Sequence, residues 1–222
     1  MAKKNISSVG VAGKRVLIRV DFNVPLKDGT ITDDRRIREA LPTIQSVIER
    51  GGRAICISHL GRPTGEGYEA GLSLKPVAER LGELLGKPVA FPSTDCTDSA
   101  TADAVNAMGD GDVLVPENLR FSKAEKKGDA SFAAKIAALG DVYVNDAFGT
   151  CHREDASVVA VPRDMVGKPR VVGFLVEKEI RYLDEKLGEP ARPFLVVLGG
   201  VKASDKLPAI RNLMDKADHI LV

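Results

Sequence analysis

The stretch 54-AICISHLGRP-63 indicates the fold and also raises the question of function. Residues 54–57 are four apolar residues in a row, a composition typical of a buried β-strand. This strand does not end in ordinary turn residues. It ends in the imidazole of His59 and the guanidinium of Arg62. A single ending of this kind favours an ordinary surface loop, so its meaning depends on whether the chain repeats it.

Strand-like and helix-like segments alternate along the chain, which predicts an α/β fold. Because such strands are joined by right-handed crossovers, we expect a three-layer, Rossmann-like parallel sheet with helices on both faces. Pro42 works against the first helix, since proline removes a backbone donor. The predicted strands are 16–22, 54–58, 88–91, 113–115, 142–144, 171–172 and 193–198. The predicted helices begin at Asp33 or Asp34, and at 74, 99, 130, 173 and 204.

Composition excludes several classes of protein. The 222 residues suffice for one large domain, or for one domain and part of another. The net charge of +1 gives no overall basic field for nucleic acid or an anionic membrane, so anion binding must come from a local cluster. No apolar run reaches the length of a membrane span, and the N-terminus lacks the apolar core of a signal peptide. Three widely spaced cysteines predict neither a disulfide framework nor a metal site, and the expected location is the cytoplasm.

Polar and basic residues follow four of the predicted strands, as they do at His59 and Arg62. The carboxyl ends of parallel strands lie at one edge of the sheet, where ligands bind. Guanidinium groups bind carboxylate and phosphate in bidentate geometry, so the cluster predicts a small anionic ligand, with hydroxyls suited to Asp21 and Asn23. The basic members of this predicted cluster are Arg36, His59, Arg62, Arg120, His152 and Arg153.

A second phosphate-binding element is predicted at 195-LVVLGGVKASDK-206. A strand and a Gly-Gly turn precede Lys202 and Lys206 near a predicted helix start, where backbone N–H groups and lysines bind phosphate. An ordinary turn with solvated lysines explains this element equally well. No P-loop is present, and the missing GxGxxG motif disfavours a dinucleotide-dependent dehydrogenase.

No covalent nucleophile is predicted. Cys151 and His152 are adjacent in sequence, so their side chains are expected to point apart, and no GxSxG motif occurs. A cluster of cations without a nucleophile favours direct phosphoryl transfer, which needs positioning and charge neutralisation rather than covalent catalysis.

Five segments resemble, in order, the motifs of the phosphoglycerate kinase family: RVLIRVDFNVP (15–25), SHLGRP (58–63), PENLRF (116–121), NDAFGT-HR (145–153) and GG-K--DK (199–206). The resemblance implies a two-lobed glycolytic kinase that moves a phosphoryl group between 1,3-bisphosphoglycerate and ADP, giving 3-phosphoglycerate and ATP, with Mg²⁺ accompanying the nucleotide. It implies a phosphoglycerate-binding lobe at 1–172, an interlobe helix at 173–188, and the start of a nucleotide-binding lobe at 189–222. The full-length form is expected to be a monomer with no nucleic-acid or membrane partner.

The resemblance also assigns roles to single residues. Arg36 and Lys202 would neutralise the migrating phosphoryl group, and Lys206 would reach the nucleotide phosphates. No protein ligand to a metal is assigned. The implied phosphoglycerate contacts are Asp21, Phe22, Asn23, Arg36, His59, Leu60, Gly61, Arg62, Arg120 and Arg153.

Two features depart from the family pattern. The family usually reads GTAHRAH, whereas residues 149–155 read GTCHRED, so Glu154 and Asp155 add two carboxylates beside Arg153. They either weaken anion binding or orient Arg153 through an ion pair, and both interpretations remain open. The chain ends in the strand-like HILV (219–222), which predicts that part of a larger protein is missing and that the isolated chain is inactive. The alternative function is a non-catalytic module that binds small anions.

Overall fold

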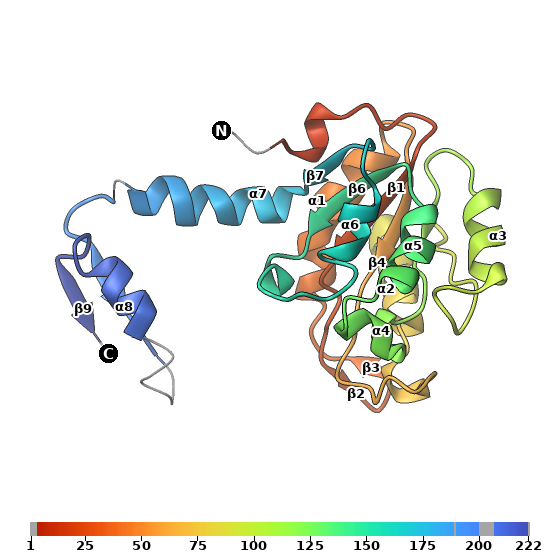
Figure 1. The fold of residues 1–222 in the computed structure, drawn as a ribbon, viewed down its shortest axis with the longest axis horizontal. Helices are drawn as coiled ribbons and strands as arrows, with labels where there is room; N and C mark the ends of the chain where they lie inside the picture. Colours follow the sequence, from red (N-terminus) through yellow and green to blue (C-terminus); the bar gives the residue numbers. More distant parts are fainter. Residues whose placement is uncertain (1–3, 189, 200–206, 222) are drawn as a thin grey trace. The chain divides into compact units, whose positions relative to one another are not determined.

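The computed structural model describes residues 4–188, 190–199 and 207–221 (Figure 1). Two compact units divide the chain, Met1–Glu177 and Lys178–Val222. Helix α7 (Phe174–Ile180) crosses this boundary and continues as a π-helical segment, Arg181–Lys186. The predicted helix from residue 173 is therefore present, but its second half is wound more loosely than an α-helix.

The first unit is built on a five-stranded parallel sheet with the order β5-β4-β1-β6-β7. After β1, the chain adds β4 and then β5 on one side of that strand, and it later adds β6 and then β7 on the other side. A topological switch point therefore lies between β1 and β6, where open α/β sheets bind ligands. The strands are β1 (Arg15–Val20), β4 (Arg53–Ile57), β5 (Val113–Leu114), β6 (Val142–Asp146) and β7 (Arg170–Val172). The predicted α/β fold is confirmed.

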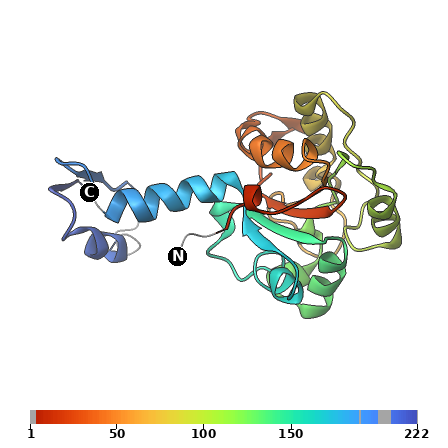
Figure 2. The same ribbon diagram turned by 90° about the horizontal axis from the view of Figure 1, so that it is seen from above.

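Helices cover both faces of this sheet (Figure 2). Helices α1 (Arg35–Ile48) and α2 (Lys75–Leu85) pack on one apolar cluster, and α3 (Ser99–Ala107), α5 (Ala130–Ala138) and α6 (Ala160–Asp164) pack on a second. Val16 and Ile18 belong to the first cluster, whereas Leu17 belongs to the second. This alternation follows from the two-residue period of a strand and places residue 19 on the α3–α5 side.

Local sequence accounts for several boundaries. Asp98 accepts a hydrogen bond from the backbone N–H of Thr101 at 2.8 Å and so caps α3, and Asp129 caps α5 by accepting from Phe132 at 2.9 Å. Pro42 lies inside α1 without ending it. The short hairpin of β2 (Leu26–Lys27) and β3 (Thr30–Ile31) turns through residues 28 and 29, both with positive φ, as an Asp-Gly hairpin turn requires.

The prediction of a strand at 88–91 is wrong. Only Ala90 forms an isolated bridge, to Leu114. Pro88 and Pro92 lack the N–H groups that a longer ladder would need. Several short helical segments also went unpredicted, among them α4 (Lys123–Lys126), α6 and a 3₁₀ turn at Leu119–Phe121.

The second unit contains a parallel pair of strands, β8 (Leu195–Val197) and β9 (His219–Leu221), with α8 (Leu207–Leu213) between them. The start of the predicted helix from residue 204 lies outside the described residues. Leu195, Val197 and Leu221 are exposed, because a pair of strands buries little apolar surface. None of the helices within the described ranges combines the length and the apolar composition needed to cross a membrane.

Candidate anion-binding site

The loops that follow β1 and β4 are joined by hydrogen bonds between side chains and backbone. Ser58 Oγ accepts from the Phe22 N–H at 2.9 Å and donates to the Val20 carbonyl at 2.9 Å. Asn23 Oδ1 accepts from the Gly61 N–H at 2.8 Å. Because both loops satisfy each other's backbone groups, they form one rigid floor at the carboxyl edge of the sheet.

Asn118, after β5, joins a third loop to this floor. Its Oδ1 accepts from the Leu60 N–H at 3.2 Å, while its Nδ2 donates to the carbonyls of Leu60 and Leu72 at 2.8 and 2.9 Å. The adjacent Glu117 accepts from Ser73 Oγ and the Leu74 N–H at 2.7 and 2.8 Å, beside the start of α2. Sequence reasoning gave neither residue a role, although both are polar residues directly after a buried strand.

Asp21 and Arg36 meet across the edge of β1. Arg36, in the first turn of α1, donates to Asp21 Oδ2, and half of its side chain remains exposed. A Cβ placed on Gly149 would lie 3.2 Å from Asp21 Oδ2, so the loop after β6 passes close to this carboxylate. Asp21 therefore orients the Arg36 guanidinium at the switch point between β1 and β6.

Arg120 and Asp155 form a buried ion pair. Arg120 Nη2 lies 3.1 Å from Asp155 Oδ2, and the two side chains are 4% and 7% exposed. Arg120 Nη1 also donates to the Gly61 carbonyl at 3.2 Å. Of the two carboxylates that depart from the family pattern, Glu154 is exposed and Asp155 is bound to Arg120. Asp155 therefore pairs with Arg120, from a different loop, and does not make the ion pair to Arg153 that was one of the two open interpretations.

His59 lies among guanidinium groups and is only 3% exposed. Burial lowers its pKa, and the charges of Arg19, Arg120, Arg153 and Arg36 lower it further, to about 2. His59 is therefore neutral at pH 7. The guanidinium groups of Arg36, Arg120 and Arg153 therefore lie close enough to His59, in the loop after β4, to act on its charge.

The remaining predicted residues divide by exposure. Arg62 and Arg153 are exposed, so their guanidinium groups are available to a ligand. Phe22 and Leu60 are buried in the apolar core, so only their backbone groups face the site. Lys202 and Lys206 lie outside the described residues.

One buried cation of this region escaped prediction. Arg19 is fully buried in β1 and contacts His59. Its only sequence signal is an arginine within an otherwise apolar strand, at 16–20.

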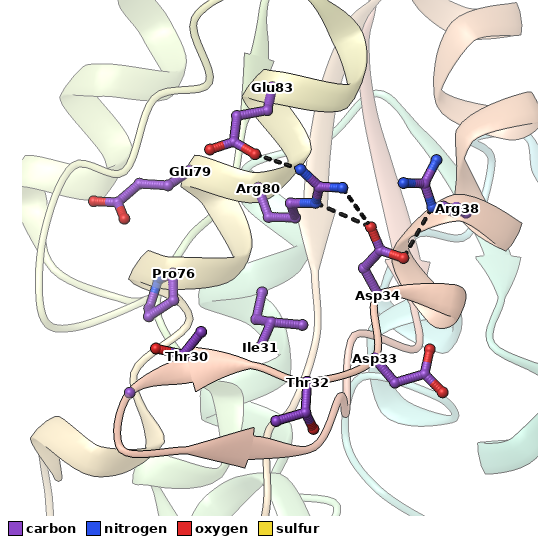
Figure 3. A pocket seen from close by; sticks show the side chains of 11 residues that line it. Thr30, Ile31, Thr32, Asp33, Asp34, Arg38, Pro76, Glu79, Arg80 and Glu83 are labelled. Carbon is purple, nitrogen blue, oxygen red and sulfur yellow. Dashed lines mark hydrogen bonds and ion pairs between the residues drawn. The ribbon is translucent and has the colours of Figure 1, made fainter.

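A separate hollow of about 770 Å³ lies between the β2–β3 hairpin, α1 and α2 (Figure 3). Asp34 Oδ1 accepts from Arg38 at 2.9 Å, while Asp34 Oδ2 accepts from Arg80 Nη2 at 2.8 Å, and Arg80 also binds Glu83 at 2.5 Å. Hydrogen bonds from Arg38 and Arg80 lower the pKa of Asp34. These charged groups bind one another between the start of α1 and the side of α2. None of the predicted anion-binding residues lines the hollow.

The fold and this cluster together define an α/β protein with basic side chains gathered at the switch point of its sheet. A family model described as phosphoglycerate kinase matches residues 6–222. A phosphoglycerate kinase of Rhodopirellula baltica and one of Enterococcus faecalis are each 57% identical to the chain, over 100% of its length and 56% of their own. The chain belongs to the phosphoglycerate kinase family, and it spans about half the length of these curated relatives.

Solved structures agree with this assignment. The phosphoglycerate kinase of Coxiella burnetii superposes with a TM-score of 0.85 at 38% identity, covering 99% of this chain and 54% of that one. The phosphoglycerate kinase of Pyrococcus horikoshii gives a TM-score of 0.86 at 33% identity, covering 97% and 54%.

Proposed function

We propose that this chain is the phosphoglycerate-binding half of a phosphoglycerate kinase, which transfers a phosphoryl group between 1,3-bisphosphoglycerate and ADP to give 3-phosphoglycerate and ATP. The observation that carries the proposal is that Arg36, Arg120 and Arg153 act on the neutral His59, whose loop is joined by side-chain hydrogen bonds to the loops after β1 and β5. Crowded cations are unfavourable unless an anion compensates them, and a ligand with a carboxylate and a phosphate supplies two anionic groups.

The positions of the side chains suggest different roles. Arg62 and Arg153 are exposed and grip the carboxylate and phosphate ends of the ligand. Arg36, held by Asp21, neutralises charge on the phosphoryl group as it moves. Arg120 is buried and paired, so it supports the Gly61 loop and contributes positive potential. Asn23 holds the same loop through the Gly61 N–H.

The nucleotide side of the reaction is part of the same proposal. Lys202 is assigned to the migrating phosphoryl group and Lys206 to the nucleotide phosphates, in a lobe that begins at 189 after an interlobe helix at 173–188. Mg²⁺ accompanies the nucleotide in this proposal, and no residue of this chain is assigned to it. The chain alone is proposed to bind 3-phosphoglycerate weakly and to turn over nothing, in the cytoplasm.

Calorimetry with three ligands tests the proposal. We expect millimolar binding of 3-phosphoglycerate, weaker binding of inorganic phosphate and no detectable binding of ADP, with no ATP formed from 1,3-bisphosphoglycerate and ADP in a coupled assay. Absence of heat with millimolar 3-phosphoglycerate, or rapid ATP formation by the chain alone, would contradict it. Equal binding of inorganic phosphate and 3-phosphoglycerate would instead support the non-catalytic anion-binding module.

A further inference from the structure

Arg19 is an arginine whose whole side chain lies inside the protein. It is 0% exposed, in the central strand β1, on the side of the sheet that α3 and α5 cover. Its Nε donates to Ser157 Oγ at 2.9 Å and its Nη1 donates to the Val20 carbonyl at 2.5 Å. The third nitrogen, Nη2, lies 3.1 Å from His59 Nδ1. Each nitrogen of the guanidinium therefore has a partner.

Charge neutralisation makes this burial possible. Glu125 is also fully buried, and its two carboxylate oxygens accept from Ser157 Oγ at 2.5 Å and from the Ser157 N–H at 2.9 Å. Ser157 thus lies between the Arg19 guanidinium and the Glu125 carboxylate. Burial lowers the pKa of Arg19 and the Glu125 charge raises it, and an arginine remains protonated throughout the physiological range.

The contact between Arg19 and His59 therefore determines which side chain donates and which accepts the hydrogen bond. A guanidinium carries five N–H donors and no acceptor, so Nδ1 of His59 must accept with its lone pair. A neutral imidazole has a single ring proton, which must therefore be on Nε2. An imidazolium would place an N–H at Nδ1 directly against the N–H of Arg19.

We propose that Arg19 is a positioning residue that fixes His59 as the neutral Nε2–H tautomer, so that His59 offers one N–H donor to an oxygen of the bound anion. Nε2 makes no hydrogen bond to the described residues, and the loop that carries His59 is fixed by Ser58 and Asn118. The tautomer follows from the contact itself. The ligand half of the inference rests on the proposed function.

A neutral donor differs from the surrounding cations in what it recognises. The arginines attract any anion through charge. An N–H on a ring held in one orientation instead favours an anion that has an acceptor lone pair at one position. Arg19 would therefore contribute to selection among anions rather than to general anion attraction. The positive charge of Arg19 interacts with three carboxylates, those of Glu125, Asp21 and Asp155. These negative charges partly cancel the contribution of Arg19 to the positive potential of the site.

Nitrogen-15 NMR of the imidazole rings tests the tautomer directly on the unmodified chain. The three histidines can be assigned with His152→Gln and His219→Gln. At pH 7 we expect His59 to show a pyrrole-type Nε2 and a pyridine-type Nδ1, unchanged at pH 5, and the Nε2–H resonance to shift on titration with 3-phosphoglycerate. A proton on Nδ1, or an imidazolium at pH 5, would overturn the inference whatever the variants do.

A paired variant tests the role of Arg19. Arg19→Met with Glu125→Gln removes both buried charges together. We expect mixed tautomers at His59, a titration of His59 nearer to the ordinary histidine range, and roughly tenfold weaker binding of 3-phosphoglycerate, the equivalent of one hydrogen bond. The matched control is Arg15→Met with Asp141→Asn, an ion pair that begins at the other end of β1. It should change neither the His59 spectrum nor the binding.

The outcomes separate the two proposals. An Nε2–H tautomer in a chain that gives no binding signal with 3-phosphoglycerate would refute the proposed function and the ligand half of this inference, while the tautomer assignment would stand. An unchanged tautomer and unchanged affinity in the paired variant would refute the positioning role of Arg19.

Discussion

The Asp155 carboxylate lies against the Arg120 guanidinium, with Nη2 and Oδ2 3.1 Å apart and both side chains buried. This pair places a negative charge inside a site whose other charged groups are mostly cations. Its effect on an incoming anion is unfavourable, because the field of Arg120 is partly cancelled at short range and in a weakly screened environment. The pair also holds Arg120 against the Gly61 carbonyl. It therefore fixes the position of the Gly61 loop while it lowers the positive electrostatic potential of the site.

Asp155→Asn separates these two effects. The amide oxygen can still accept from Arg120, but the negative charge is gone, so 3-phosphoglycerate should bind about tenfold more tightly. Arg120 loses its buried counter-charge, so the free energy of unfolding should fall by about 1–3 kcal/mol. Calorimetry and urea denaturation measure the two effects. Glu154→Gln removes the same charge from an exposed neighbour and should change both quantities little. Weaker binding in Asp155→Asn would show that orientation outweighs charge.

Arg62→Ala should abolish detectable binding of 3-phosphoglycerate and leave the free energy of unfolding within about 0.5 kcal/mol of the parent value. Arg62 is exposed, so its removal leaves no buried group without a partner. Arg120→Ala is the informative contrast, because it strands the Asp155 carboxylate inside the protein and should cost about 3–5 kcal/mol. Binding titrations and thermal melts of both variants check this. Unfolding of Arg62→Ala would make that arginine structural.

His59 should make the acid limb of the stability curve steeper. Its pKa is lowered to about 2 by burial and neighbouring guanidinium groups, whereas an unfolded histidine titrates near 6.5. As pH falls below 6.5 the unfolded chain gains a proton that the folded chain excludes, so stability falls by up to about 1.4 kcal/mol per pH unit. The contribution is fully present above pH 6.5.

His59→Gln isolates this contribution. A glutamine oxygen accepts from Arg19 but does not titrate, so the variant should lose stability more gradually than the parent between pH 6.5 and 5. Burial raises the pKa of Glu125 and of Asp146, which makes the folded state bind protons more readily and acts in the opposite direction in both proteins. Urea denaturation at a series of pH values gives the two curves. Parallel curves would exclude His59 as a source of the slope.

The sheet and the edge that carries the cluster were predictable from the sequence because their signals are local. Apolar runs such as 54–57 mark strands, the segments between them mark crossovers, and the rule for parallel sheets then places His59 and Arg120 at one edge. The position of Arg36 follows from the predicted start of the first helix at Asp33 or Asp34. None of these inferences requires knowledge of which side chain touches which.

The polar contacts beneath the cluster were not predictable, because they join residues that are distant in sequence and of types usually exposed. Arg19 is paired with Ser157, 138 positions away, and Asp155 with Arg120 in another loop. The partner of Asp155 depends on how the segment after residue 150 folds back, where Ala156 donates to the Glu125 carbonyl at 2.7 Å. Adjacency in the chain offered Arg153 as one possible partner of Asp155, whereas the tertiary structure pairs Asp155 with Arg120.

The start of α7 provides the last prediction. Asp146, the final residue of β6, accepts the backbone N–H groups of Leu175 and Val176 on its Oδ1 at 2.9 and 3.3 Å. A carboxylate so placed satisfies free donors in the first turn of the helix and matches its dipole. A Cβ on Gly173 would lie 2.3 Å from Asp146 Cγ, so only glycine lets the backbone approach this closely.

Gly173→Ala should therefore push the Asp146 carboxylate away from the first turn of α7 and reduce the free energy of unfolding by about 1–3 kcal/mol, the usual cost of overpacking. Amide exchange at Leu175 and Val176 should become faster, because those N–H groups lose their acceptor. Gly10→Ala is the matched control, since its Cβ would meet no atom within 4 Å. Hydrogen exchange measured residue by residue distinguishes the outcomes. Unchanged protection at both amides, with the expected loss of stability, would mean that the strain is relieved elsewhere and that Asp146 remains bound to the helix.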